Sequence, residues 1–96
     1  MILSFRCDET RSLFESGSSR RWGNILTVAT RKLAMLNAAT ELRDLRSPPG
    51  NRLELLQSNR VGQHSIRIRI RINDQWRICF VWTDAGPMQV EIVDYH

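Results

Sequence analysis

The feature that most constrains this chain is the nine-residue run from His64 to Ile72, H-S-I-R-I-R-I-R-I, in which isoleucine and arginine alternate strictly. Side chains of a β-strand point to opposite faces with a period of two, whereas an α-helix repeats every 3.6 residues. The run therefore predicts a strand with isoleucines on one face and Arg67, Arg69 and Arg71 on the other. Such a row of guanidinium groups is suited to binding a polyanion.

The size and charge of the chain narrow the class of protein. With 96 residues it is long enough for one hydrophobic core and too short for two, so we expect a single domain spanning residues 1–96. Fourteen basic residues, of which 13 are arginine, stand against ten acidic ones, which gives a formal net charge of +4. Arginine binds phosphate through paired hydrogen bonds and stacks on bases, so this bias favours a nucleic-acid partner. The alternative is a basic protein whose arginine content reflects a GC-rich genome.

Targeting signals and metal motifs are not evident in the sequence. Charged residues interrupt positions 1–25, and no later stretch approaches the roughly 18 apolar residues of a membrane span, so we expect a cytoplasmic protein with no membrane association. Cys7 and Cys79 lie far apart, without a CxxC motif or a second His or Cys nearby. We therefore expect two small buried hydrophobic residues and no bound metal.

The N-terminal half is predicted to contain one strand and two or three helices. Residues 1–7 alternate enough for a first strand, and Asp8 is a plausible N-cap for a short helix that stops before Gly17. A longer amphipathic helix is expected over 20–37, and a further turn or two over 38–45 ends at the Ser-Pro-Pro-Gly stretch 47–50. Apolar residues with helical spacing mark the buried side of the long helix: Trp22, Ile25, Ala29, Leu33 and Leu36.

The C-terminal half is predicted to be a run of antiparallel strands. These are expected at 52–56, at the arginine run, at 76–82 and at 88–95, with turns at 58–62, 73–75 and 83–87. Parity assigns Trp76, Ile78, Phe80 and Trp82 to the face of the isoleucines, beneath the helices. Arg77 points the other way, toward the arginine row. The expected fold is α+β, with two to three N-terminal helices packed on one face of a small twisted antiparallel sheet.

Several motifs together resemble the HigB toxins of the RelE superfamily. The resemblance extends nearly from end to end and is specific in combination, although any one tetrapeptide would be weak. The matching stretches are SFRC (4–7), RRW (20–22), RKL (31–33), LNAA (36–39), LRSPPGNRLE (45–54), GQHSIR (62–67), NDQWRICFVW (73–82) and VEIVDYH (90–96).

The resemblance implies a fold, a reaction and partners. The family fold is two helices on a small antiparallel sheet, in agreement with the order predicted above. The implied reaction is metal-independent, cofactor-free cleavage of messenger RNA in the ribosomal decoding site, in which the ribose 2′-hydroxyl attacks the adjacent phosphate. This chemistry requires a base, an acid and cations for the developing phosphorane charge. The implied protein partner is a small helix-turn-helix antitoxin, HigA-like, encoded beside the toxin.

The resemblance also implies roles for particular residues. His64, Asp94, Tyr95 and His96 match positions credited with catalysis, and Arg77 and the arginine after His-Ser-Ile match phosphate-binding positions. A histidine suits proton transfer because its unperturbed pKa is about 6.5. Each role has an alternative: an exposed strand-start residue at position 64, a tyrosine ring that plugs the core edge, or a frayed terminal histidine. The arginines of the long helix form either a solvated face or a contact with ribosomal RNA.

The chain departs from the family pattern inside the arginine run. The usual pattern places five steps between the histidine and the asparagine, whereas His64 and Asn73 are nine steps apart. Four added residues preserve parity, but the hairpin must then displace His64, slip in register, or absorb the addition in a bulge or longer tip. We expect the last outcome, with activity reduced relative to a version lacking the repeat. Whether Arg67 or Arg71 is the family's own arginine stays open.

Two other functions compete with the endonuclease. The first is a protein that still binds RNA or the ribosome through its arginines but no longer cleaves, because the added residues have separated the catalytic groups. The second is a β-ribbon DNA-binding module that inserts the arginine strand into a major groove.

Overall fold

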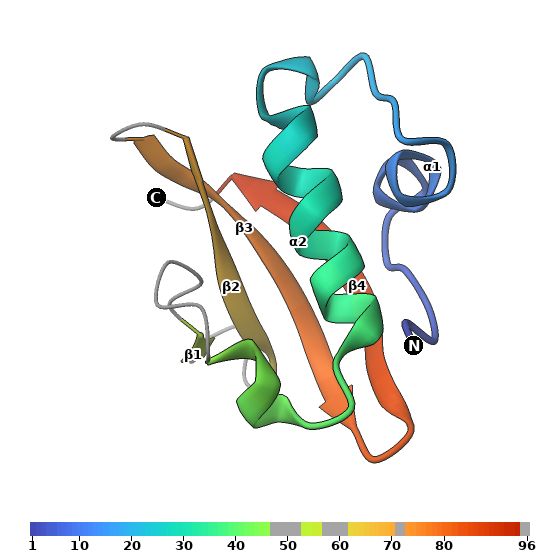
Figure 1. Cartoon of the computed structure of the whole chain (residues 1–96), viewed down its shortest axis with the longest axis vertical. Coiled ribbons are helices and arrows are strands. Elements are labelled where there is room, and N and C mark those ends of the chain that lie inside the picture. Colours follow the sequence, from blue (N-terminus) through green and yellow to red (C-terminus); the bar gives the residue numbers. More distant parts are fainter. Residues whose placement is uncertain (47–52, 57–61, 71–72, 95–96) are drawn as a thin grey trace.

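One antiparallel sheet and two helices form the fold. The computed structural model describes residues 1–46, 53–56, 62–70 and 73–94. The helices are α1 (Asp8–Ser16) and α2 (Leu26–Ala38), with 3₁₀ turns η1 (Gly23–Ile25) and η2 (Leu42–Leu45); the strands are β1 (Glu54–Leu55), β2 (His64–Ile70), β3 (Asn73–Thr83) and β4 (Gly86–Asp94). The strand order is β1-β2-β3-β4. Helix α2 lies across one face of the sheet and α1 packs against α2 and β4 (Figure 1). The expected α+β class is confirmed.

Helix α1 begins and ends close to the expected residues, but its cap differs. Cys7 precedes the helix in an extended conformation and occupies the N-cap position, so Asp8 is the first helical residue and the predicted Asp8 cap is wrong. Asp8 and Glu9 instead stand in the first turn, where a negative charge interacts favourably with the helix dipole. Gly17 ends the helix in the left-handed conformation (φ 72°) that a residue without a Cβ adopts most easily.

Helix α2 begins later than its apolar spacing predicted. The Trp22 backbone is not helical, and its N–H donates to the Ser19 hydroxyl oxygen at 3.2 Å, a local bond that competes with helix formation. One 3₁₀ turn then leads into the α-helix. Because a 3₁₀ turn has about three residues, it keeps nearly the same apolar spacing. All five residues predicted to be buried are therefore at most 2% exposed: Trp22, Ile25, Ala29, Leu33 and Leu36.

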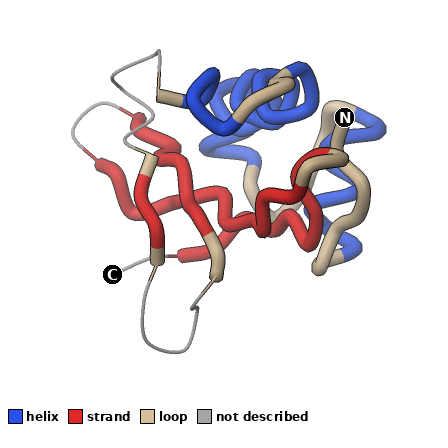
Figure 2. The backbone as a smooth tube through the Cα atoms, turned by 90° about the horizontal axis from the view of Figure 1, so that it is seen from below, coloured by secondary structure: helices blue, strands red, loops and turns tan. Residues whose placement is uncertain are grey.

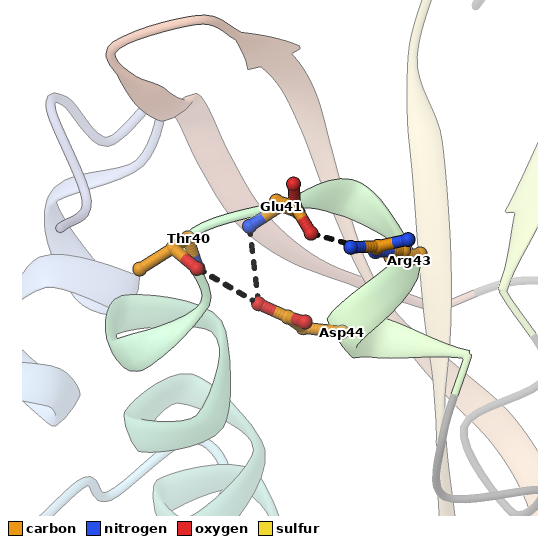
Figure 3. Close-up of polar contacts among 4 residues, drawn as sticks. All are labelled: Thr40, Glu41, Arg43 and Asp44. Carbon is orange, nitrogen blue, oxygen red and sulfur yellow. Dashed lines mark hydrogen bonds and ion pairs between the residues drawn. The ribbon is translucent and has the colours of Figure 1, made fainter.

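The segment after α2 is a 3₁₀ turn with its own cap. The predicted helical continuation through residue 45 is replaced by an extended residue at Ala39 and then by η2. The Asp44 carboxylate accepts hydrogen bonds from the backbone N–H groups of Glu41 (3.1 Å) and Thr40 (3.0 Å), which closes a capping box (Figure 3). These bonds, that from Glu41 first, lower the pKa of Asp44. The Pro-Pro stretch 47–50 lies outside the described residues.

The β2–β3 hairpin is regular at its base and irregular toward its tip. Pairing is unbroken from His64 opposite Phe80 to Ile68 opposite Trp76, and a register shift then brings Ile70 opposite Asn73. Residues 73–75 therefore belong to β3. The reversal predicted at 73–75 is wrong, because the pairing of β3 with β2 extends to Asn73. Residues 71–72 between the two strands lie outside the described residues. That the added residues are absorbed in a bulge or longer tip stays a prediction.

The edges of the sheet differ from the prediction in detail. Of the strand expected at 52–56, β1 comprises Glu54–Leu55, and residue 52 is not described. The strand expected at 1–7 reduces to one parallel bridge between Phe5 and Val90. Next to that bridge β4 carries a bulge, and Gln89 within it has a φ of 53°. The bulge prevents a longer ladder between β4 and residues 1–7. The predicted turn after β3 is confirmed and tightened, since Thr83 pairs directly with Gly86.

The core lies between α2 and the sheet face that bears Ile66, Ile78 and Phe80, each with no exposed surface. Trp76 and Trp82 are partly buried against it. Figure 2 shows this layered arrangement, with α2 on one side of the strands. The alternation of the sequence thus predicted the packing of these residues, whereas the side chains of Ile68, Ile70 and Ile72 lie outside the described part of the chain.

Candidate functional site

The sheet face opposite the core brings charged residues of neighbouring strands into rows. One row crosses all four strands as Glu54, Ser65, Cys79 and Glu91, each directly opposite the next. The adjacent row contains Arg67, Arg77 and Val93. Side chains alternate along a strand, so both rows lie on the face that Ile66 and Ile78 do not share. We call this surface the arginine face.

Arg77 is held at the centre of the arginine face. Its strand, β3, has neighbours on both sides, and Arg77 is only 8% exposed. Its Nη1 donates a hydrogen bond to the Ser65 hydroxyl at 3.3 Å and lies 3.5 Å from a carboxylate oxygen of Glu54. A buried charge is tolerated in a protein when it is paired and hydrogen-bonded. Glu54 and Ser65 provide both kinds of interaction.

Arg67 and Arg77 occupy directly opposite positions in the β2–β3 pairing. The side chain of Arg67 lies outside the described part of the chain, so only its backbone position is known. On the arginine face Glu54 is a carboxylate that contacts Arg77.

His64 lies on the other face, at the start of β2. Its ring stacks on Phe80 with centroids 6.1 Å apart and planes 21° from parallel. The side chain is partly buried, and within the described part of the chain its Nδ1 is buried without a hydrogen-bond partner. Burial lowers the pKa of His64, so the neutral imidazole predominates at pH 7. A neutral imidazole serves as a proton acceptor, and this environment differs from the exposed strand-start residue of the alternative interpretation.

The structure does not bring His64, Arg77 and Asp94 together. His64 is opposite Phe80 and Asp94 is opposite Trp76, so their rows are separated by four residues of β3, about 13 Å along a strand. Asp94 is exposed at the end of β4, and Arg77 faces away from His64. Of the remaining predicted site residues, Arg67 and Arg69 are placed only through the backbone of β2, and Arg71, Tyr95 and His96 lie outside the described residues. Their roles stay predictions.

Two residues that contact Arg77, Ser65 and Glu54, were not predicted from the sequence to be functional. Ser65 has the same parity as the arginine row, and this signal was sufficient to place it on that face. Glu54 carries no such signal, because its position next to Ser65 depends on how two strands far apart in sequence pair. Its contact with Arg77 is visible only in the fold.

The charged residues around the long helix lie mainly at the protein surface. Arg21 donates to Glu9 at 2.6 Å and lies over the Trp22 ring, 5.0 Å from its centroid. Lys32 is partly buried, and desolvation, followed by repulsion from Arg31, lowers its pKa. A pocket of about 250 Å³ lies near the start of α1, and none of the predicted site residues lines it. Its lining residues are Asp8, Glu9, Ser12, Ser18, Ser19, Arg20 and Arg21.

The sequence predicted no bound metal, two buried cysteines and no membrane span. No group of three or more potential metal ligands occurs among residues 1–46, 53–56, 62–70 and 73–94. Cys79 is buried and Cys7 partly buried, and neither forms a disulfide. No helix in these ranges has the length and hydropathy needed to span a membrane.

The chain is similar to known toxins over most of its length. Residues 3–96 match the model of the RelE-like toxin of type II toxin–antitoxin system HigB. The chain is 38% identical over 87 residues to Toxin HigB-1 of Vibrio cholerae serotype O1, covering 88% of this chain and 87% of that protein. It is 37% identical over 78 residues to an uncharacterized protein of Haemophilus influenzae, covering 79% and 73%. The protein is therefore a toxin of a type II toxin–antitoxin system. Within that class it belongs to the HigB-like family, as its motifs predicted.

Proposed function

We propose that this toxin is a ribosome-dependent endoribonuclease that cleaves messenger RNA without a metal and thereby inhibits translation. The observation that carries the proposal is the arginine face, where Arg77 is fixed at the centre of the sheet and Arg67 occupies the position directly opposite. Two arginines at opposite positions suit a phosphate that gains negative charge in the transition state. The family membership supports the same reaction.

The proposed mechanism assigns the proton transfers by the environment of His64 and by family resemblance. Arg77 stabilises the charge that develops on the phosphate when the 2′-hydroxyl attacks it. His64 is neutral at pH 7 and suited to accept the hydroxyl proton. Asp94, Tyr95 and His96, by family resemblance, complete the site from the end of the chain and supply the acid for the leaving oxygen. No cofactor enters this scheme.

A primer-extension assay on a defined message tests the proposal. The purified protein is added to a reconstituted translation reaction, and the same message without ribosomes is the matched control. We expect cuts within the translated region when ribosomes are present and no cuts without them. An uncut message in the translating reaction would contradict the proposal.

The proposed partners follow from the same function. The substrate is messenger RNA in the ribosomal decoding site, in the cytoplasm, and the neutralising partner is a helix-turn-helix antitoxin of the HigA kind. Co-expression with the neighbouring antitoxin gene should restore growth and yield a stable complex on purification. Separate elution of the two proteins at micromolar concentration would argue against this partner.

A second candidate is a protein that binds the ribosome without cleaving. The specific observation in its favour is that His64 faces the core side while Arg77 lies on the arginine face. In that case the protein co-sediments with ribosomes and slows translation, while primer extension shows an intact message. The assay above separates the two candidates directly.

The length of the β2–β3 hairpin provides a sharper test. If four residues have been added, the unbroken pairing at the base means that two residues lengthen each strand and extend the tip by about 7 Å. A longer tip must still fit beside the message, so we propose that the addition lowers activity. Deletion of residues 68–71 restores the family spacing and should raise the cleavage rate. Equal rates for the two proteins would refute this proposal.

A further inference from the structure

We propose that Glu54 is a positioning residue that, together with Ser65, fixes the Arg77 guanidinium for contact with the RNA phosphate. This inference rests on the proposed function, which requires Arg77 to meet a phosphate. Glu54 was not among the residues that the sequence marked as functional. Its assignment comes from the pairing of β1 with β2 and from its contact with Arg77.

The geometry places both partners on one atom of Arg77. The Ser65 hydroxyl is 3.3 Å from Nη1, and a carboxylate oxygen of Glu54 is 3.5 Å from the same nitrogen. Glu54 and Ser65 are directly opposite each other in the β1–β2 pairing, so the two contacts come from adjacent strands on one side of Arg77. Two contacts on one terminal nitrogen restrict rotation of the guanidinium and select one orientation of its plane.

The need for such support follows from the side chain itself. Arginine has several rotatable bonds and loses rotamer entropy when it is held in one conformation. Reacting groups must be held to within about 0.5 Å of productive geometry. Burial already restricts the Arg77 side chain, and the contacts with Glu54 and Ser65 further narrow the orientations of its guanidinium toward the phosphate. Glu54 reduces the remaining freedom before the substrate arrives.

Burial distinguishes this pair from the Arg21–Glu9 pair. The Arg77 side chain is 9% exposed and that of Glu54 is 36% exposed, whereas Arg21 and Glu9 are both 54% exposed although they are only 2.6 Å apart. Exposed ion pairs contribute little to stability and constrain the side chains little, because water and salt screen them. Arg77 is largely removed from that screening, whereas Glu54 is partly exposed. The burial of Arg77, and not the contact length, makes Glu54 the positioning partner.

The test compares charge removal at two Glu–Arg pairs. Glu54→Gln removes the carboxylate charge with little change in shape, and Glu54→Asp keeps the charge on a shorter side chain. Glu9→Gln is the matched control, because it removes the same charge from an exposed pair outside the arginine face. The measurements are kcat and KM for ribosome-dependent cleavage and the thermal midpoint of each variant.

We expect Glu54→Gln to lower kcat about tenfold with KM changed less than threefold, since the interaction serves the transition state. Glu54→Asp should recover part of kcat, and Glu9→Gln should cleave at the wild-type rate. Unchanged kcat in Glu54→Gln would overturn the proposal. A higher kcat or a lower KM would also overturn it, because Glu54 would then compete with the phosphate for Arg77.

A second measurement separates this inference from the proposed function. Nitrogen NMR of the arginine side chains reports guanidinium rotation without any cleavage reaction. We expect separate Nη signals for Arg77 in the wild type and in Glu9→Gln, and merged signals in Glu54→Gln. If the wild type fails to cleave, the proposed function fails, and the NMR result still decides whether Glu54 positions Arg77. Identical Arg77 signals in wild type and Glu54→Gln would refute the positioning role.

Discussion

The two faces of one sheet are stabilised in different ways, and the adjacent residues Arg77 and Ile78 show the difference. Both are buried, at 8% and 0% exposure, and both lie in the central strand β3. Ile78 packs beneath α2 among apolar neighbours, where burial alone is favourable. Arg77 is buried on the opposite face, where its charge requires Glu54 and Ser65. The comparison shows that alternation separates a stabilising face from one suited to chemistry.

The largest expected effect is on the core face. Ile78→Ala removes a fully buried side chain and leaves a cavity, so it should lower the free energy of unfolding by about 2–5 kcal/mol. Urea denaturation followed by circular dichroism measures the change. A loss below about 1 kcal/mol would mean that the core face is less closely packed than the comparison requires.

A smaller loss of stability is expected on the arginine face. Arg77→Ala removes two polar contacts, but Glu54 is 36% exposed in its side chain and can regain water. The free energy of unfolding should fall by about 1–3 kcal/mol, less than for Ile78→Ala. The same urea titration checks the order of the two variants. A reversed order would show that Arg77 contributes more to stability than Ile78 does, which would contradict the comparison.

His64 should give the core face a pH dependence. Burial lowers the pKa of His64 in the folded protein, so the unfolded chain binds the proton more tightly. Stability is therefore fully present above the unfolded value of about 6.5 and declines as the pH falls through it toward the folded pKa. Thermal midpoints between pH 8 and pH 5 should decline less in His64→Gln than in the wild type. Parallel profiles would indicate that His64 is not the responsible group.

The smallest effect is expected outside both faces. Glu9→Gln breaks the exposed contact with Arg21 and should change the free energy of unfolding by less than about 1 kcal/mol. Raising the salt concentration in the urea titration should reduce even this difference, because salt screens exposed charges. A loss as large as that of Arg77→Ala would remove the contrast between exposed and buried pairs.

The sequence was sufficient to predict the layers of the fold and the face of each strand residue. Strict alternation assigned Ile66 and Ile78 to the core and Arg77 to the opposite side, and the buried residues of α2 followed from their spacing. Parity carries this information because a strand has only two faces. The helix starts were less predictable, since Trp22 is held out of the helix by the Ser19 hydroxyl.

The candidate site was predictable only in part. Arg77 was assigned to the correct face, but its burial and its contact with Glu54 depend on which strands pair and in which register. The position of His64 against Phe80 also follows from register and not from composition. Local patterns predict the face of a residue, whereas contacts between distant strands arise from the whole fold.

The central claim is that Arg77 on the arginine face stabilises the transition state of the reaction, whereas Ile78 on the core face maintains the fold. The most direct measurement is the rate of ribosome-dependent cleavage by Arg77→Ala, compared with Ile78→Val as a control that also costs stability, about 0.5–1.5 kcal/mol. We expect Arg77→Ala to cleave at least 100-fold more slowly, as for loss of one group that stabilises transition-state charge, and Ile78→Val to cleave at nearly the wild-type rate. Cleavage by a folded Arg77→Ala within twofold of the wild type would contradict the claim.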